Sequence, residues 1–383
     1  MVDQIRKAAV LGAGTMGSRI AAHLANAGVP CLLLDVAPEG ADTHAPRNSI
    51  TAKALKGLHQ SRPPALFTAE TSGLIKIGNF DDDIERIQEA DWVIEAVVEN
   101  FEVKRTLLAK VDQHRKRGSL VSSNTSGLPI GALAEGYSEA FREHWLGIHF
   151  FNPPRHMRLI EVIPGPETKP EVVNFLSDFC DRRLGKVLVY SHDRPNFIAN
   201  RIFLFTVMHT AKMMIEQGLS VEEVDTLTGP LIGRPRMATF RLADFTGIDV
   251  CLFIAETLHR LIPEDEKRDV FDPPDFLRQM VAKGMAGDKA GRGFYAKVKG
   301  GAGKNRLVLD LESLEYRKPR PPKWPVLELA QNIADTGDRI RFLLHSDDPV
   351  GRFLWATVSE LLLYTAARIP EITDDIVSVD TTM

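Results

Sequence analysis

Short apolar runs alternate with amphipathic stretches along the first half of the chain. The apolar run at 8–11 is followed by a glycine-rich turn, by residues 18–28 with apolar positions at helical spacing, and by a second apolar run at 31–34. This order of strand, glycine turn, helix and strand is typical of the first unit of a doubly wound sheet. Further strands are expected at 90–99, 119–124, 145–151, 158–163 and 186–191, and further helices at 48–58, 103–116 and 170–185.

The pattern changes after Pro195, where long apolar helical periodicity begins. We therefore predict an α/β Rossmann-type doubly wound sheet at the N-terminus, followed by an all-α C-terminal domain. Glycine-rich and proline-rich segments further on indicate a linker. Residues 200–228 and 351–383 each contain a long apolar helix, a turn and Val-Asp-Thr, which indicates a weak internal repeat. The expected parts are the sheet domain at 1–191, a helical domain at 192–296, the linker at 297–325 and a partial second helical repeat at 326–383.

Composition and charge narrow the classes of ligand and location. Hydrophobic residues make up 44% and charged residues 26% of the 383 residues, as in ordinary globular proteins. The net charge of -4 gives no overall attraction to nucleic acid or anionic membranes. The three cysteines lack CxxC spacing, so we expect no disulfide framework, no metal site and a reducing, cytoplasmic location. No secretory leader is expected, because the first residues run directly into the strand at 8–11. No membrane span is expected either, because no apolar stretch approaches roughly 20 residues.

The segment Gly-Ala-Gly-Thr-Met-Gly at 12–17 is a candidate dinucleotide-binding turn, since it follows an apolar strand and begins a helix. The first glycine allows the tight turn, the second lets the backbone approach a pyrophosphate, and the third lets helix pack against strand. Asp35 ends the next strand, where its carboxylate can bind ribose hydroxyls; no arginine follows it, which favours NAD over NADP. The expected cofactor-binding residues are Gly12, Gly14, Thr15, Met16, Gly17 and Asp35. An ordinary glycine turn, with Asp35 beginning a loop, is the alternative.

His149 is the candidate proton acceptor for oxidation of a hydroxyl group, because imidazole exchanges protons near neutral pH. It lies in the expected strand WLGIHFF, and Glu161 lies in the next, RLIEVI. If these strands pair antiparallel about Arg155, the two residues fall nearly opposite each other. A carboxylate there can fix the imidazole tautomer. The alternative is a core histidine with a satisfied hydrogen bond, but a glutamate within an apolar run needs a partner.

Ser126 and Asn200 are further candidates with weaker signals. Ser126 lies in SSNTSG after an apolar run, where the C-terminal edge of a sheet presents loop side chains to a ligand. Asn200 begins a helix beyond the expected domain boundary. Taken alone, each residue is better explained by a turn or a helix cap than by a role in binding.

Seven motifs, in this order, resemble the L-3-hydroxyacyl-CoA dehydrogenases of fatty-acid β-oxidation, including those fused to an enoyl-CoA hydratase. They are GAGTMG, EAVVENFEVK, SSNTSG, GIHFFNPP, LIEVI, NFIANRI and GDKAGRGFY, and they extend over about residues 6–295. The resemblance implies NAD-dependent oxidation of an L-3-hydroxyacyl-CoA to a 3-ketoacyl-CoA.

The resemblance also implies roles for individual residues. His149 would be the catalytic base and Glu161 its orienting partner, while Ser126 and Asn200 would bind the 3-oxygen of the substrate. The implied NAD contacts are Glu99, Lys104, Ser126, Asn152 and Lys289. Ser49 and Lys56 match the helix that meets the phosphates of coenzyme A, although lysines on a helix surface are usually only solvated.

Two departures from the family pattern matter. Residues 237–245 read MATFRLADF where single-function members often have Gly-Pro-Phe, which puts the shape of the acyl pocket in doubt. The part after Tyr295 resembles the linker and second helical repeat of the fused enzymes, yet no hydratase domain follows, so no hydratase activity is expected for these 383 residues. The expected partners are an acyl-CoA substrate and either a second copy of the chain or a fused or missing hydratase part.

Three other interpretations stay open. An enzyme of the same fold could act on a small hydroxy acid or sugar acid without coenzyme A. A non-catalytic NAD-binding relative could have kept the fold, although His149, Glu161, Ser126 and Asn200 argue against it. The chain could also be a fragment whose helical part docks other domains.

Overall fold

A computed structural model describes residues 2–40, 47–297 and 306–383. The chain forms two compact units, one made of Met1–Ile198 with Ile369–Met383 and the other of Ala199–Arg368. It therefore leaves the first unit after Ile198 and returns to it after Arg368.

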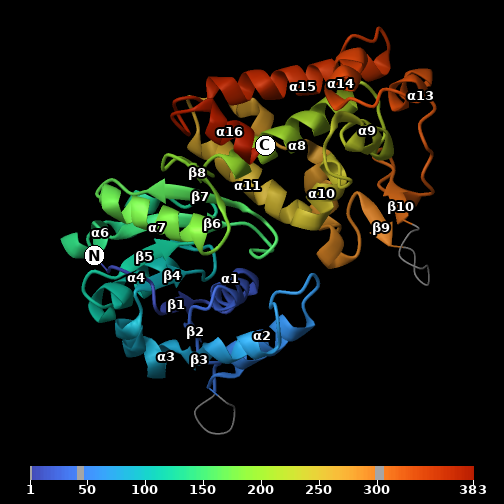
Figure 1. Cartoon of the computed structure of the whole chain (residues 1–383). Coiled ribbons are helices and arrows are strands. Elements are labelled where there is room, and N and C mark those ends of the chain that lie inside the picture. Colours follow the sequence, from blue (N-terminus) through green and yellow to red (C-terminus); the bar gives the residue numbers. More distant parts are fainter. Residues whose placement is uncertain (1, 41–46, 298–305) are drawn as a thin grey trace. The chain divides into compact units, whose positions relative to one another are not determined.

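The first unit is built on one twisted sheet (Figure 1). Within the described residues its strands are β1 (Ala8–Leu11), β2 (Cys31–Asp35), β3 (Ile75–Asn79), β4 (Trp92–Glu95), β5 (Leu120–Ser123), β6 (Trp145–Phe150), β7 (Leu159–Pro164) and β8 (Val187–Tyr190). Their order is β3-β2-β1-β4-β5-β6-β7-β8, and every neighbouring pair is parallel except β6 with β7. The predicted doubly wound, mostly parallel sheet is confirmed. β3 was not predicted, because Ile-Lys-Ile-Gly-Asn is short and lies in a turn-rich stretch.

Helices cover both faces of this sheet (Figure 1). The helices of the first unit are α1 (Thr15–Asn26), α2 (Ser49–Gln60), α3 (Phe80–Asp83), α4 (Phe101–His114), α5 (Ile130–Ala134), α6 (Glu139–Arg142), α7 (Pro170–Arg182) and α16 (Ile376–Thr382), with short 3-10 helices at Glu70–Leu74 and Ile84–Glu89. β1 contributes Ala8 and Val10 to one apolar cluster and Ala9 and Leu11 to the other. Both faces are apolar because successive side chains of a buried strand point in opposite directions.

The connections reverse direction at β1, with β2 on one side of it and β4 on the other. In open α/β sheets, ligands bind beyond the carboxyl ends of the strands at such a reversal. The turn after β1 is the glycine-rich segment, and β4 ends at Glu95, so both lie at this edge.

The second unit is mainly helical, as predicted. Its helices are α8 (Ala199–Glu216), α9 (Val221–Leu227), α10 (Thr239–Thr246), α11 (Ile248–Leu261), α12 (Asp275–Ala282), α13 (Pro325–Gln331), α14 (Thr336–Leu344) and α15 (Pro349–Ala367), with 3-10 helices at Pro230–Ile232, Arg268–Phe271 and Asp288–Ala290. A small antiparallel sheet joins β9 (Tyr295–Lys297), β10 (Arg306–Leu309) and β11 (Tyr316–Arg317). β10 and β11 lie within the segment expected to be a linker, whose residues 298–305 are outside the described ones. Strands this short carry too few residues for a recognisable alternation.

A buried group of charges joins α8 to α15 in the second unit. Asp265 Oδ2 lies 2.5 Å from Arg201 Nη2, 2.9 Å from Arg368 Nη1 and 3.0 Å from the hydroxyl of Tyr364. The Tyr364 ring stacks on Phe205 of α8, with centroids 3.8 Å apart. Asp265 therefore pairs with both arginines in the interior, where an uncompensated charge is costly, and Glu266 pairs with Arg368 as well.

Replacing Asp265 with alanine is expected to destabilise the chain by about 3–5 kcal/mol, because the two buried guanidinium groups lose their shared carboxylate. Thermal unfolding followed by circular dichroism measures the effect. Asp269→Ala is the matched control, since the side chain of Asp269 is 97% exposed. Equal melting temperatures for the two variants would contradict the prediction.

The end of the chain packs against the edge strand β8 of the first unit. Ile372 is fully buried, and its carbonyl accepts a hydrogen bond from the backbone N–H of His192 at 2.8 Å. The hydroxyl of Thr373 donates to the carbonyl of Tyr190 at 2.9 Å. α16 follows and contacts β8. The helix, turn and Val-Asp-Thr of the second repeat are α15, the turn after it and α16.

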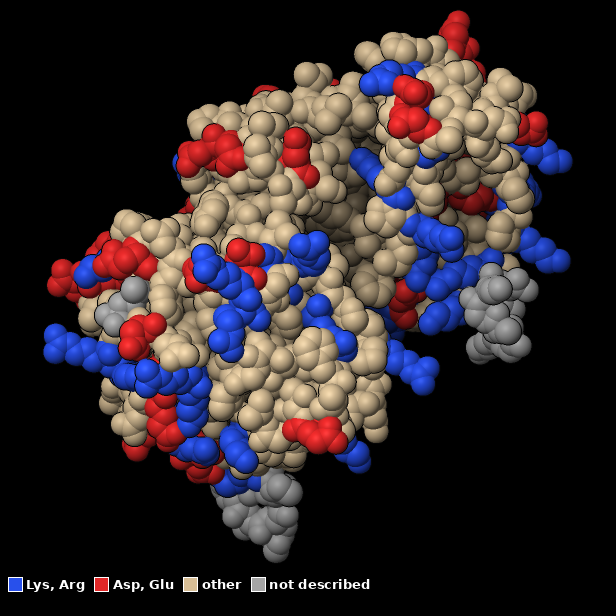
Figure 2. Space-filling model, viewed as in Figure 1, with Lys and Arg blue, Asp and Glu red and all other residues tan. Residues whose placement is uncertain are grey.

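Several general properties of the described residues bear on function. The helices among them are too short or too polar to cross a bilayer, and no group of three or more metal-ligating side chains is gathered there. The three cysteines are free thiols and are buried. Basic and acidic side chains are interspersed on the visible face (Figure 2), in keeping with a small net charge.

Candidate functional site

The turn between β1 and α1 has the geometry that a dinucleotide requires. Gly12 has φ of 106°, and a Cβ there would lie 2.5 Å from the carbonyl oxygen of Ala96. A Cβ on Gly17 would lie 1.9 Å from the carbonyl oxygen of Gly12, so helix and turn could not approach each other. A Cβ on Gly14, in contrast, would meet no atom within 4 Å. The space beside Gly14 is therefore open to a ligand such as a pyrophosphate.

α1 begins at Thr15 without a side-chain cap, so the backbone N–H groups of its first turn are available to an anion. Asp35, at the end of β2, accepts hydrogen bonds from the backbone N–H of Ala13 at 2.6 Å and of Val36 at 2.7 Å. The carboxylate is thereby fixed beside the turn, where it can meet ribose hydroxyls. Thr15 and Met16 lie in the first turn of α1. These residues fit NAD.

His149 and Glu161 face each other across β6 and β7. The two strands pair antiparallel with these residues directly opposite, which confirms the pairing expected from the sequence. His149 Nδ1 lies 2.6 Å from Glu161 Oε2, and the residues are 4% and 0% exposed. The other carboxylate oxygen accepts a hydrogen bond from the backbone N–H of Ile198 at 2.9 Å. The carboxylate is therefore held at both oxygens.

Other histidines that lie near carboxylates differ from His149. His192 pairs with Asp374 and His259 with Asp269, but these carboxylates are 84% and 97% exposed. An exposed carboxylate is screened by water and orients its partner weakly. Burial alone does not make a histidine a proton acceptor, because desolvation lowers the pKa of His23 to about 4 and, among the described residues, no carboxylate opposes this shift.

The segment after β8 completes the surroundings of this pair. Asn196 and Phe197 have φ of 63° and 53°, in the left-handed region that residues other than glycine rarely adopt. A Cβ on Gly127 would lie 2.5 Å from Asn196 Oδ1, so the glycine of SSNTSG lets the two segments meet. The ring of Phe197 lies 6.0 Å from that of His149, between centroids. This conformation presents the N–H of Ile198 to Glu161.

Ser126 lies in the loop after β5, which is fixed by several hydrogen bonds. Its backbone N–H donates to Glu99 Oε1 at 2.9 Å, and the hydroxyl of Thr125 donates to the same oxygen at 2.5 Å. Asn124 Oδ1 accepts from the backbone N–H of Phe150 at 2.8 Å. Because Phe150 follows His149, the loop of Ser126 is tied to the strand of the candidate base.

Lys104, expected from the resemblance to contact NAD, lies inside the first unit. Its side chain is 1% exposed, and Nζ lies 2.7 Å from Glu95 Oε1 and 3.2 Å from Glu99 Oε2. Glu99 is 40% exposed at its side chain and can face a ligand. A contact of Lys104 with NAD stays a prediction.

Other candidates are spread over the two units. Asn152, in the loop after β6, is exposed and accepts a hydrogen bond from the guanidinium group of Arg19 in α1. Asn200, in α8, and Lys289, in the 3-10 helix before β9, belong to the second unit. Lys289 Nζ lies 2.6 Å from Asp249 Oδ2. That Asn200 and Lys289 contribute to the site stays a prediction.

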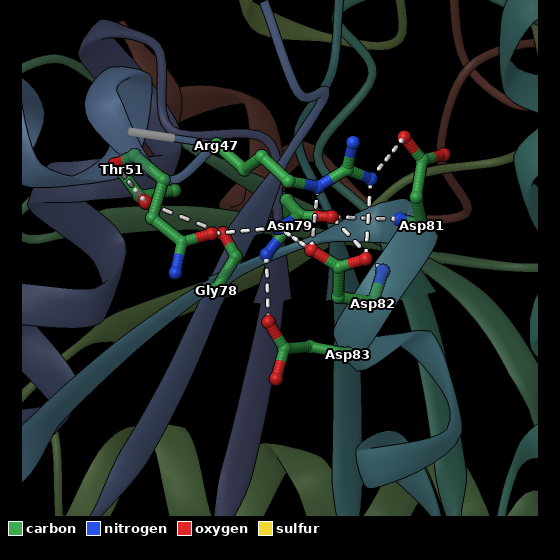
Figure 3. Close-up of polar contacts among 8 residues, drawn as sticks. Arg47, Thr51, Gly78, Asn79, Asp81, Asp82 and Asp83 are labelled. Atoms are coloured by element: carbon green, nitrogen blue, oxygen red, sulfur yellow. Dashed lines mark hydrogen bonds and ion pairs between the residues drawn. The ribbon is translucent and has the colours of Figure 1, made fainter. Parts of the chain in front are cut away.

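The start of α2, which carries Ser49 and Lys56, is anchored to the end of β3 (Figure 3). Arg47 Nε donates to Asp82 Oδ2 at 2.8 Å, and Asn79 Nδ2 donates to Asn48 Oδ1 at 2.7 Å and to Asp82 Oδ2 at 2.8 Å. Ser49 is partly buried and Lys56 is exposed. These bonds fix the first turn of the helix, while Lys56 stays accessible to an anion.

Sequence reasoning missed Glu95, Asn124 and Arg19. Glu95 could have been found by the signal that indicated Glu161, an acidic residue that ends an apolar run, here WVIE. Asn124 and Arg19 gave no such signal, because their partners lie 26 and 133 residues away.

Comparison with known proteins gives matches over the whole chain. Residues 7–194 match the family model of the 3-hydroxyacyl-CoA dehydrogenase NAD-binding domain, and residues 197–297 match that of the 3-hydroxyacyl-CoA dehydrogenase C-terminal domain. The chain is 42% identical to a "Probable 3-hydroxyacyl-CoA dehydrogenase" of Deinococcus radiodurans, over 77% of this chain and 84% of that one.

A Bacillus subtilis protein with the same description is 45% identical over 100% of this chain but 49% of its own length, so the chain spans about half of that relative. The crystal structure of 3-hydroxybutyryl-CoA dehydrogenase from Escherichia coli is similar with a TM-score of 0.73 and 23% identity, over 99% of this chain and 88% of that one. This likeness supports the fold of both units, including the part after residue 297.

Proposed function

The chain belongs to the 3-hydroxyacyl-CoA dehydrogenase family, and from this we propose that it oxidises the hydroxyl group of an L-3-hydroxyacyl thioester of coenzyme A, with NAD as the acceptor. The product is the 3-ketoacyl thioester. The observation that carries the proposal is the buried pair of His149 and Glu161, in the same unit as a turn that fits a dinucleotide.

His149 is the proposed proton acceptor. A carboxylate can only accept hydrogen bonds, so the short contact with Glu161 assigns the imidazole proton to Nδ1 and leaves Nε2 free to accept. When Nε2 takes the hydroxyl proton, the ring becomes positive, and the buried carboxylate stabilises that charge. Because Glu161 is also held by the N–H of Ile198, the carboxylate keeps its position during the transfer.

Other residues bind and orient in this proposal. Ser126 and Asn200 hydrogen-bond the 3-oxygen of the substrate and hold it near His149. When bound, NAD would supply the acceptor for the hydride that leaves the carbon carrying the hydroxyl group. Asp35 binds its ribose, while Glu99, Asn152 and the residues of the glycine turn complete the cofactor contacts.

Ser49 and Lys56 are proposed to meet the phosphates of coenzyme A. Lys56 is exposed on α2, and the anchored start of the helix offers backbone N–H groups near Ser49. Since the Bacillus subtilis relative is about twice as long, contact with a further catalytic part, such as a hydratase, belongs to the same proposal.

The proposal is tested by following NADH formation with L-3-hydroxybutyryl-CoA and, separately, with free 3-hydroxybutyrate. We expect kcat/KM for the thioester to exceed that for the free acid by about a hundredfold or more, because coenzyme A supplies binding energy remote from the reacting carbon. Equal rates, or activity with the free acid alone, would assign the site to a small hydroxy acid instead. No turnover with L-3-hydroxybutyryl-CoA, with L-3-hydroxyacyl-CoA thioesters of longer acyl chain or with the free acid would reject the proposed activity.

A further inference from the structure

The carboxylates of Glu95 and Glu99 and the ammonium group of Lys104 lie next to the loop that carries Ser126. Glu95 ends β4 with a fully buried side chain, Glu99 lies in the turn that follows, and Lys104 lies in the first half of α4. The ammonium group lies within 3.2 Å of both carboxylates. Without a cation here, the buried carboxylate of Glu95 would be uncompensated and would repel Glu99.

Each carboxylate also holds part of the loop after β5. Glu95 Oε2 accepts from the hydroxyl of Ser123 at 2.5 Å, and the oxygen of that hydroxyl accepts from the backbone N–H of Thr125 at 3.0 Å. Glu99 Oε1 accepts from the hydroxyl of Thr125 and from the N–H of Ser126. The two carboxylates thus fix the backbone on both sides of Thr125.

Thr125 also fixes the residues that follow it in the loop. It is fully buried, and its side-chain oxygen accepts from the backbone N–H of Leu128 at 3.0 Å. The neighbouring Asn124 is bonded to Phe150, beside His149. A shift of Glu99 or Glu95 therefore displaces Ser126 relative to the imidazole.

We propose that Lys104 and Glu95 form a positioning unit. In this unit, Lys104 neutralises Glu95 and Glu99, so that these carboxylates hold Ser126 in a fixed position relative to His149. Lys104 acts through the carboxylates, because its buried ammonium group is directed at them. The inference rests on the proposed function only for the catalytic meaning of Ser126; the constraint on the loop is independent of the substrate.

The test compares Lys104→Met with Lys110→Met, a control on the exposed face of the same helix. The measurements are hydrogen exchange of residues 124–128, the Kd for NADH, and kcat with L-3-hydroxybutyryl-CoA. For Lys104→Met we expect faster exchange of the loop and a kcat lower by on the order of tenfold to a hundredfold, since small displacements in a reacting site have effects of this size. Because Glu99 is itself a proposed NAD contact, the Kd for NADH is expected to rise as well, but by a smaller factor than kcat falls.

A double variant, Glu95→Gln with Lys104→Met, tests the coupling and replaces the single variant if that one does not fold. With both charges removed, the loop protection and kcat of the double variant should be closer to those of the unmodified chain than the values of Lys104→Met are. If Lys104→Met does not fold, the double variant is compared with Glu95→Gln in the same way. Additive losses in the double variant would overturn the proposal. So would unchanged loop exchange in Lys104→Met together with a tenfold weaker Kd for NADH, which would identify a direct cofactor contact.

A result that rejects the proposed function differs from one that rejects the role of Lys104. An unmodified chain that binds NADH but oxidises no L-3-hydroxyacyl-CoA, whether of short or long acyl chain, would reject the activity. Loop exchange in the variants would still decide whether Lys104 positions Ser126.

Discussion

Turnover by a His149→Ala variant is expected to fall by a hundredfold or more, while NADH binding stays nearly unchanged. The variant lacks the imidazole that accepts the hydroxyl proton. Asp35, which is expected to bind the cofactor together with the glycine turn, is bonded to the N–H of Ala13, whereas His149 is bonded to Glu161, so the cofactor-binding residues should keep their geometry. Steady-state kcat with L-3-hydroxybutyryl-CoA and fluorescence titration with NADH measure the two quantities.

His114→Ala provides the matched control, because this half-buried histidine near the end of α4 lies outside the proposed site. Its kcat should equal that of the unmodified chain. If His149→Ala turned over substrate at the same rate as His114→Ala, the assignment of the base would be wrong.

The second large effect is expected for Glu161→Gln, which keeps the shape of the side chain and removes its charge. The two oxygens of Glu161 accept from His149 Nδ1 and from the N–H of Ile198. A glutamine has one acceptor oxygen and one amide group that only donates. If the oxygen faces Ile198, the amide group faces Nδ1, which must then accept, and the proton moves to Nε2. If it faces His149, two donors meet at Ile198.

Either arrangement is unfavourable for catalysis, because an Nε2 that carries a proton cannot accept another and the imidazolium loses its carboxylate. We expect kcat to fall by roughly a hundredfold or more. Glu167→Gln, at a half-exposed glutamate of the same unit, is the control for the chemical change. A kcat for Glu161→Gln within a few-fold of that control would show that the carboxylate does not orient the base.

The geometry of this pair could be predicted from the sequence because two conditions coincide. The strands flank a turn-rich segment about Arg155, which favours a fold-back, and a glutamate within an apolar run requires a partner. The doubly wound sheet followed similarly from alternating apolar runs. The conformation of Asn196 and Phe197 brings the N–H of Ile198 to Glu161. It depends on tertiary packing and could not be predicted from the pattern of apolar and polar residues.

The network around Lys104 shows a different limit. The resemblance supplied the residue, but the direction of its side chain follows from the burial of Glu95 and the course of α4. Asn200 and Lys289 likewise came from motif matching alone. Local periodicity indicates which elements form, whereas a contact between distant residues is decided by how those elements pack.

The return of the chain to β8 has a consequence for biosynthesis. Tyr190 and His192 emerge from the ribosome about 180 residues before Ile372 and Thr373, which bond to them. At about 5–20 residues per second, that delay is roughly ten to forty seconds. During this interval β8 is already synthesised, but the segment that carries Ile372 and Thr373 is not. The edge of the sheet is then open to pairing with another nascent chain. The need for a chaperone should therefore be greatest during this interval.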